Sequence, residues 1–166
     1  LTSLANEHGL IVAYVDHIPL SEKHLITLSF SAETIKNHYC IDEKKITYLG
    51  HSDGGTLASI LSYRDLGIKP KNIIISAAGL NNEGLKNETC PSFRFSTLIL
   101  HSIKDKLFYG YGLDNYNWLN NCRKCQNNEV KTSKYCKFAL ECEDINVYCE
   151  GTNSHTQWPN NENKNI

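Results

Sequence analysis

The sequence contains no methionine and begins at Leu1, so we expect an N-terminally incomplete part of a longer chain. It has no run of about 18 apolar residues, the length that a membrane-spanning helix needs, and we expect no membrane partner. Its 17 basic and 18 acidic residues nearly balance, and no basic stripe indicates nucleic acid. The 166 residues suffice for one domain, placed here at residues 1–159, before a polar tail at 160–166 that we expect to be disordered.

Cysteine, by contrast, is abundant: there are seven, and five lie within residues 122–149. The C-x-x-C pair of Cys122 and Cys125 has the spacing of zinc ligands, but no second such pair follows. We therefore favour disulfide bonds formed in an oxidising compartment, with one cysteine left over and a pairing that spacing does not determine. The triplet Asn87-Glu88-Thr89 matches the acceptor sequence for N-glycosylation.

Short apolar runs alternate with segments whose apolar residues recur at helical spacing. Because each run is apolar throughout, it is typical of a strand buried in a parallel sheet. Strands are expected at 10–15, 46–49, 73–75, 97–100 and 145–149, and helices at 21–39, 56–63 and 113–125. This alternation predicts an α/β fold with a mostly parallel sheet and helices on both faces.

The string from Gly50 to Gly55, GHSDGG, fits the G-x-S-x-G pattern of a nucleophilic serine. The pattern is common by chance, but here it follows a predicted strand and precedes a predicted helix, as such a serine requires. The alternative to a nucleophile turn is an ordinary glycine turn between strand and helix. A phosphate-binding loop is excluded, because it would end in G-K-[ST] and this string does not. We predict that Ser52 lies on a strained turn with small neighbours, and that the Asp53 amide faces a developing oxyanion.

A serine hydroxyl becomes a good nucleophile when a base takes its proton, and in this arrangement an aspartate and then a histidine follow the serine. Each is expected after a later strand, at the sheet edge where ligands bind. Asp105 and His155 follow the last two predicted strands. Of the other histidines, four precede the serine, His51 adjoins it and His101 ends a strand, so we predict the triad Ser52, Asp105 and His155.

Several stretches together carry a resemblance to a known group of proteins. They are residues 4–9, 40–42, 50–55, 101–109, 118–122 and 147–151, followed by His155, Trp158 and Pro159. Over about residues 2–159 the chain resembles the polyhydroxybutyrate depolymerases and the feruloyl or acetylxylan esterases of the α/β-hydrolase fold. The resemblance implies that fold, with the group's first strands missing from this sequence, and assigns the acid to Asp105.

Two features depart from the group's pattern. Ser102 and Phe108 stand where the acid loop of the group usually carries a glycine and a proline. The resemblance also implies that a loop rich in His and Gly, which supplies a second oxyanion donor, precedes Leu1. Loss of one such donor costs about 2.7–4 kcal/mol of transition-state stabilisation. We therefore expect the isolated chain to be weakly active and, with an unpaired sheet edge, to fold less readily.

The triad predicts hydrolysis of a carboxylic ester through an acyl-enzyme, without a metal or organic cofactor. By resemblance, the substrate is a feruloyl or acetyl ester of a plant cell-wall polysaccharide, or a polyhydroxyalkanoate, and the protein is secreted. Candidate substrate-binding residues are Trp118, Tyr109 and Tyr111, with core packing as the alternative role, and His51 beside the serine. Alternative functions are a serine peptidase of the same fold, a non-catalytic hydrolase-like binding protein and a cysteine-rich structural module.

Overall fold

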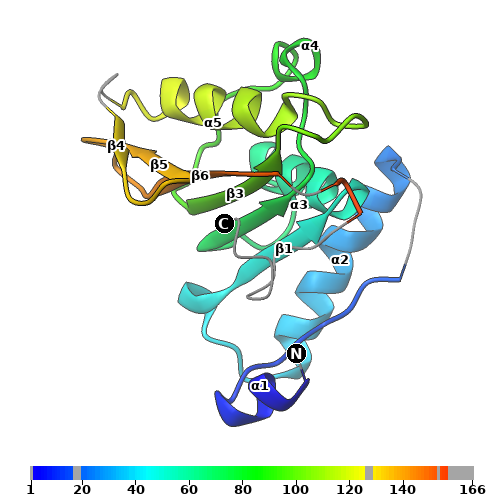
Figure 1. Ribbon diagram of the computed structural model, residues 1–166. Coiled ribbons are helices and arrows are strands. Elements are labelled where there is room, and N and C mark those ends of the chain that lie inside the picture. Colours follow the sequence, from blue (N-terminus) through cyan, green and yellow to red (C-terminus); the bar gives the residue numbers. More distant parts are fainter. Residues whose placement is uncertain (1, 17–19, 126–128, 153, 157–166) are drawn as a thin grey trace.

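The computed structural model describes residues 2–16, 20–125, 129–152 and 154–156, which form an α/β fold with one mixed sheet (Figure 1). The helices are α1 (Thr2–Glu7), α2 (Glu22–His38), α3 (Asp53–Tyr63), α4 (Asn82–Leu85) and α5 (Tyr111–Cys122), with a short 3-10 helix η1 (Glu43–Lys45). The strands are β1 (Thr47–His51), β2 (Asn72–Ser76), β3 (Ser96–Ser102), β4 (Glu129–Lys131), β5 (Cys136–Ala139) and β6 (Asn146–Gly151). The predicted tail at 160–166, Trp158 and Pro159 lie outside the described residues.

The sheet has the strand order β1-β2-β3-β6-β5-β4. Neighbours among β1, β2, β3 and β6 are parallel, whereas β5 and β4 continue the sheet antiparallel. The prediction of a mostly parallel sheet is confirmed, since the four parallel strands correspond to four of the predicted apolar runs. The β4–β5 hairpin was missed because β4 is exposed and two of its three residues are charged, and because β5 has four residues with Lys137 among them, so neither strand forms a continuous apolar run.

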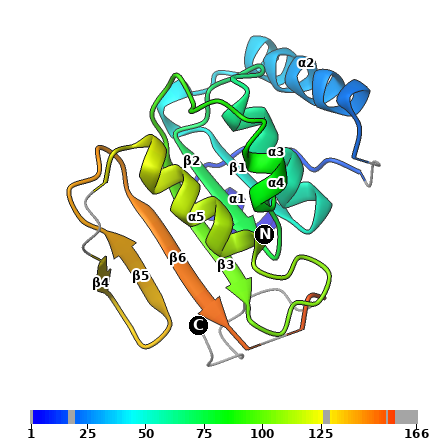
Figure 2. The same cartoon turned by 90° about the horizontal axis from the view of Figure 1, so that it is seen from above.

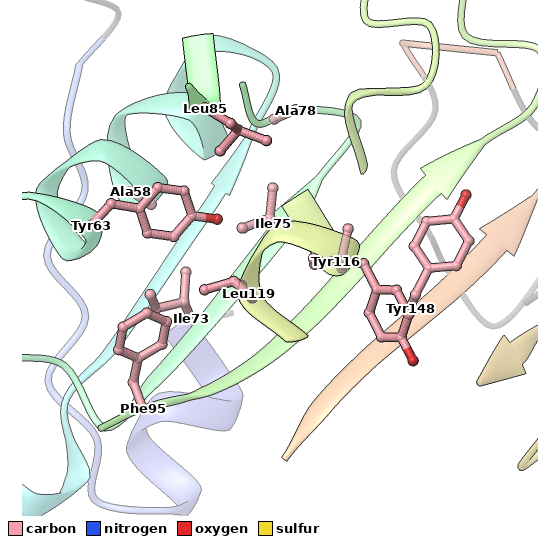
Figure 3. Packing of buried hydrophobic residues seen from close by; sticks show 11 residues of the cluster. Ala58, Tyr63, Ile73, Ile75, Ala78, Leu85, Phe95, Tyr116, Leu119 and Tyr148 are labelled. Atoms are coloured by element: carbon pink, nitrogen blue, oxygen red, sulfur yellow. The ribbon is translucent and has the colours of Figure 1, made fainter. Parts of the chain in front are cut away.

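Helices α3 and α5 cover the same face of the sheet and bury the main core against it (Figure 2). Side chains two residues apart on a strand share a face, and Ile73, Ile75 and Ile99 point into this core with no exposed area. Figure 3 shows the aromatic and aliphatic side chains that α3, α5 and the strands contribute. A second cluster joins Leu25 of α2 to the outer side of α3.

Helix α2 begins where the sequence predicts. Ser21 is its N-cap, and its side-chain oxygen accepts the backbone N–H of His24 at 3.3 Å. Helix α3 differs from α2 in being buried on all sides from Gly55 to Tyr63, which explains its nearly continuous apolar sequence. Helix α5 ends three residues earlier than predicted, at Cys122 rather than residue 125.

The opposite face of the sheet is less well covered than predicted. Ile74, Leu98 and Leu100 are half-buried there, and Leu49 of β1 is exposed. The predicted strand at 10–15 is wrong, since these residues form no strand and all are exposed. Among the described residues β1 pairs with β2 alone, and an apolar segment becomes a strand when its backbone has a strand to pair with.

Three disulfide bonds confirm the prediction made from the cysteine content. They link Cys90 to Cys122, Cys125 to Cys142, and Cys136 to Cys149. The alternative of a zinc pair is wrong, because Cys122 and Cys125 are each bonded to another cysteine. The cysteine left over is Cys40, which is exposed. No helix in the described part of the chain is long and apolar enough to cross a membrane.

Candidate active site

The three predicted triad residues follow β1, β3 and β6, which are parallel members of one sheet. Parallel strands end at the same edge of a sheet, so the segments that follow them are brought together there. Ser52 comes directly after β1, Asp105 three residues after β3, and His155 four residues after β6. The fold therefore brings together three side chains of which the first and last, Ser52 and His155, are 103 residues apart in sequence.

Ser52 occupies a strained turn between β1 and α3. Its backbone angles, φ 54° and ψ −132°, lie where residues other than glycine are rarely found. Its N–H donates to the carbonyl of Ser76 at the end of β2, at 3.0 Å. A Cβ at Gly50 would lie 2.2 Å from the Gly54 carbonyl oxygen, and one at Gly55 would lie 2.6 Å from the Ala78 Cβ. Strand and helix thus pack too closely for any side chain at either glycine.

The structure assigns the steric requirement differently from the G-x-S-x-G pattern itself. The pattern names Gly50 and Gly54 as the small neighbours of Ser52, but a Cβ at Gly54 would meet no atom within 4 Å. The second glycine that packing requires is Gly55, which lies outside the five-residue pattern. Of the two glycines in the pattern, packing therefore requires Gly50 to be small but not Gly54.

The structure brings Ser52, His155 and Asp105 into one hydrogen-bonded chain. Ser52 Oγ lies 2.9 Å from His155 Nε2, and His155 Nδ1 lies 2.8 Å from Asp105 Oδ2. Both distances are those of normal to short hydrogen bonds. This is the order of contacts in which an aspartate orients a histidine and the histidine can take a proton from a serine.

Asp105 has no exposed area, and a buried carboxylate needs several donors to remain charged. Burial acts to raise the pKa of Asp105, but the hydrogen bond from His155 and those from the backbone of Phe108 and Leu107 outweigh it, and the pKa lies below its usual value. The two backbone N–H groups donate to Oδ1 at 3.0 and 2.9 Å, which leaves Oδ2 for His155.

The ionised state of Asp105 fixes the direction of the remaining hydrogen bonds. A carboxylate has no proton to give, so His155 Nδ1 must donate to it. In the neutral imidazole Nε2 then carries no hydrogen and accepts from the Ser52 hydroxyl. The imidazole is therefore oriented with its free lone pair on the serine.

Two aromatic rings that the sequence did not mark as neighbours of the base hold the His155 ring. Phe108 stacks on it, with 5.3 Å between ring centroids and 8° between ring planes. His51 lies 5.4 Å away at 36° and hydrogen-bonds to Ser76 Oγ through Nδ1 at 3.1 Å. The departure from the group's pattern at Phe108 is the one sequence signal that could have pointed to this stack.

His101 lies behind the triad as a buried second histidine. Its Nε2 is 4.0 Å from Asp105 Oδ2, and a Cβ on Gly112 of α5 would meet its ring at 2.6 Å. Burial lowers the pKa of His101, against the opposing effect of Asp105. Burial likewise lowers the pKa of His51, with the nearby His155 adding to the effect. Because both pKa values lie below 6.5, the imidazole rings of His101 and His51 are mainly neutral near pH 7.

The backbone amide of Asp53 is the first of α3. The first amides of a helix have no partner within it, and the helix dipole concentrates positive potential there. Because Asp53 follows Ser52, this amide lies beside the hydroxyl that would attack a carbonyl. It is the amide that the sequence predicts as an oxyanion donor.

The predicted substrate-binding residues fall into two groups. Trp118 packs against Tyr63, with 4.7 Å between ring centroids, at the opposite end of α3 from Ser52. A helix of 11 residues is about 16 Å long, so the structure does not bring Trp118 to the triad. Tyr109 is 75% exposed on the loop that carries Asp105, and Tyr111 meets Phe108 edge-on at 5.2 Å. Tyr111 and His51 thus adjoin the acid–base pair, Tyr111 through Phe108 and His51 through the His155 ring, whereas Tyr109 shares only the loop with Asp105.

Within the described residues, no group of three or more His, Cys, Asp or Glu side chains is arranged to hold a metal ion. No model of a known protein family matches the chain. No curated protein is significantly similar to it in sequence.

Proposed function

We propose that this protein is a serine hydrolase that cleaves carboxylic esters through an acyl-enzyme intermediate. The observation that carries the proposal is the continuous hydrogen-bonded chain from Ser52 through His155 to Asp105, with contacts of 2.9 and 2.8 Å. The strained turn at Ser52 supports it, because a non-glycine residue with positive φ is held at a cost of about 1–3 kcal/mol and such strain gathers at functional sites.

In the first half of the reaction, Ser52 Oγ attacks the ester carbonyl carbon while His155 Nε2 takes the serine proton. Asp105 stabilises the imidazolium that forms. The tetrahedral intermediate then collapses, the ester C–O bond breaks, and His155 returns the proton to the departing alcohol. In the second half a water molecule repeats these steps on the acyl-enzyme and releases the acid.

The negative charge on the carbonyl oxygen needs donors during both steps. The Asp53 amide is placed for one of them, at the positive end of α3. In this proposal a second donor acts beside the Asp53 amide, and loss of one such donor costs about 2.7–4 kcal/mol of transition-state stabilisation.

The substrate class rests on resemblance and on the loop beside the base. Feruloyl or acetyl esters of plant cell-wall polysaccharides and polyhydroxyalkanoates are the proposed substrates. Tyr109 is exposed enough to contact the acyl group or sugar of such an ester. The three disulfide bonds are compatible with an extracellular protein, as these polymeric substrates require.

The test is hydrolysis of p-nitrophenyl acetate and methyl ferulate by the chain and by its Ser52→Ala variant. Ser31→Ala, which removes an exposed hydroxyl on α2, is the matched control. We expect turnover above the uncatalysed rate in the wild-type and control proteins and its loss in Ser52→Ala. Equal rates in all three folded proteins would contradict the proposal. The ratio of the wild-type rates on the two substrates would rank acetyl against feruloyl esters.

A further inference from the structure

The triplet Asn87-Glu88-Thr89 follows α4 and has no part in the proposed hydrolysis. It is the one Asn-x-Ser/Thr triplet in the sequence whose middle residue is not proline. Such a triplet is the acceptor for transfer of an oligosaccharide to the asparagine amide. Because many such triplets are buried or never modified, the surroundings of this one decide whether it can serve.

The structure places both reactive side chains of the triplet on the surface. Asn87 and Thr89 are exposed, whereas Glu88 between them turns inward and is 5% exposed at its side chain. Glu88 is held there by Arg64, whose guanidinium donates to both carboxylate oxygens. This ion pair anchors the middle residue and leaves the amide and the hydroxyl facing solvent on either side.

The local hydrogen bonds are compatible with a modified asparagine. Asn87 Nδ2 donates one hydrogen bond, to the carbonyl of Glu83 at 3.2 Å. An amide nitrogen carries two hydrogens, so one can be replaced while the other keeps this contact. The Asn87 backbone N–H donates to Gly84, at 3.1 Å, and is unaffected by changes at the side chain. Attachment of a sugar therefore requires no rearrangement of the α4 turn.

The cysteines provide an independent indication. Cys90 directly follows the triplet and is bonded to Cys122, one of three disulfides in the chain. Disulfides of this density form in oxidising compartments such as the endoplasmic reticulum, where N-linked oligosaccharides are also transferred. The triplet and its modifying enzyme would therefore meet in the compartment in which this chain folds.

We propose that Asn87 is an N-glycosylation site. The co-substrate is an oligosaccharide carried on a lipid diphosphate. Asn87 Nδ2 forms a bond to C1 of the first sugar, and the bond from C1 to the diphosphate oxygen breaks. The lipid diphosphate leaves with the bonding electron pair, and the proton lost from Nδ2 is taken up by the solvent. No oxidant or reductant takes part.

The glycan lies away from the proposed active site. Arg64, which anchors Glu88, follows the C-terminal end of α3, whereas Ser52 caps its N-terminal end. The length of α3, about 16 Å, separates the two. Helix α4 also projects from the body of the molecule in Figure 1. Glycosylation at Asn87 thus leaves the triad accessible, and this inference does not depend on esterase activity.

The test is expression of the chain behind a signal peptide in a eukaryotic host, followed by intact-mass and peptide mass spectrometry before and after N-glycosidase digestion. We expect a glycan on Asn87 in the wild-type protein, its loss in Asn87→Gln and Thr89→Ala, and its retention in Thr89→Ser. Asn37→Gln, which changes an exposed asparagine of α2 outside any triplet, is the control and keeps the glycan.

Both the secreted protein and any fraction retained in the secretory pathway are measured, so that poor folding of a variant does not hide the result. Asn87 found unmodified in wild-type protein whose disulfides have formed would overturn the proposal. A glycan that persists in Asn87→Gln would overturn it as well, since it would lie elsewhere. Loss of the glycan in Thr89→Ser as well as in Thr89→Ala would also overturn it, because a hydroxyl at position 89 would then not be what the acceptor triplet requires.

Discussion

The two halves of the candidate site are held in place by different interactions. In the nucleophile turn (residues 50–55), position is set by steric contact: Gly50 and Gly55 let β1 and α3 approach until no side chain fits between them. In the acid–base pair (Asp105 and His155), position is set by hydrogen bonds and ring stacking across 50 residues of sequence. The first half depends mainly on one short string and on the end of the neighbouring strand at Ser76 and Ala78, whereas the second depends on loops that the whole sheet brings together.

Because different interactions hold the two halves, we expect mutations in them to change different properties. A steric constraint fails abruptly, because a Cβ placed against backbone atoms has no low-energy alternative. A hydrogen-bonded pair can lose one partner and keep its fold, but the reaction depends on the proton positions it sets. We therefore expect substitutions of the turn's tightly packed glycines to act on stability and substitutions around the acid–base pair to act on rate.

The largest effect on rate is expected from Asp105→Asn. The amide cannot carry the negative charge that fixes the His155 tautomer, and loss of this control lowers kcat by about 10⁴-fold in a serine triad. The measurement is ester hydrolysis alongside circular dichroism. Asp114→Asn, which changes a half-buried carboxylate of α5 that accepts hydrogen bonds from Asn82 and has no contact with the triad, is the control and should keep the wild-type rate. A loss below tenfold in folded Asp105→Asn would contradict the assigned role.

The largest effect on stability is expected from Gly50→Ala. The new Cβ would lie 2.2 Å from the Gly54 carbonyl oxygen, so we expect a loss of more than about 3 kcal/mol in the free energy of unfolding. Gly54→Ala is the matched control, since its Cβ meets no atom within 4 Å and alanine favours the helix by up to about 1 kcal/mol. Urea unfolding of both variants measures the difference. Equal destabilisation would show that the turn is not sterically set.

A smaller effect on rate is expected from Phe108→Leu. Removal of the stacked ring forfeits about 0.5–1.5 kcal/mol of aromatic contact, and the freed imidazole should lower kcat by about 3- to 10-fold. Phe108→Tyr keeps the ring and should restore the rate. Ile103→Ala, on the same loop and exposed, serves as the control. A change confined to KM, with kcat unaltered, would argue that Phe108 contacts substrate instead of holding the base.

The smallest effect is a dependence of stability on pH near neutrality. The pKa values of His101 and His51 lie below that of a free histidine, so the unfolded chain takes up protons first as the pH falls through about 6.5. Stability is therefore fully present above the unfolded-state pKa and is lost as the pH falls below about 6.5 toward the lower pKa values of the folded state. The Asp105 contribution is lost at lower pH, through its depressed folded-state pKa. Urea unfolding of His101→Gln across this range should show a flatter profile, and an unchanged slope would contradict the assignment.

The sequence predicted the nucleophile turn better than its surroundings. Gly50, Ser52 and the adjoining strand and helix share one short string, so their geometry follows from local residue types. The acid and the base were chosen by chain order, and the structure places both within hydrogen-bonding distance of their partners. The stack of Phe108 on His155 was missed, because it arises where the loops after β3 and β6 meet, and the unusual residue at 108 was its one signal in the sequence.

The fold shows the same limit. Four apolar runs became the parallel strands, but the run at 10–15 did not, because strand formation depends on a neighbouring strand that hydropathy does not report. The β4–β5 hairpin carries no apolar run, yet the Cys136–Cys149 bond joins β5 to β6 at directly opposed residues. The cysteine content predicted that disulfide bonds exist, but which cysteines pair with one another could be seen only in the folded structure.

The most direct test of the central claim is covalent labelling by a fluorophosphonate, followed by peptide mass spectrometry. An activated serine forms a bond from Oγ to phosphorus, fluoride leaves, and the base takes the serine proton. We predict that the label is found on Ser52 and that labelling falls sharply in His155→Gln, with Ser31→Ala unchanged. Folded wild-type protein that takes no label at Ser52, or that labels equally in His155→Gln, would contradict the account.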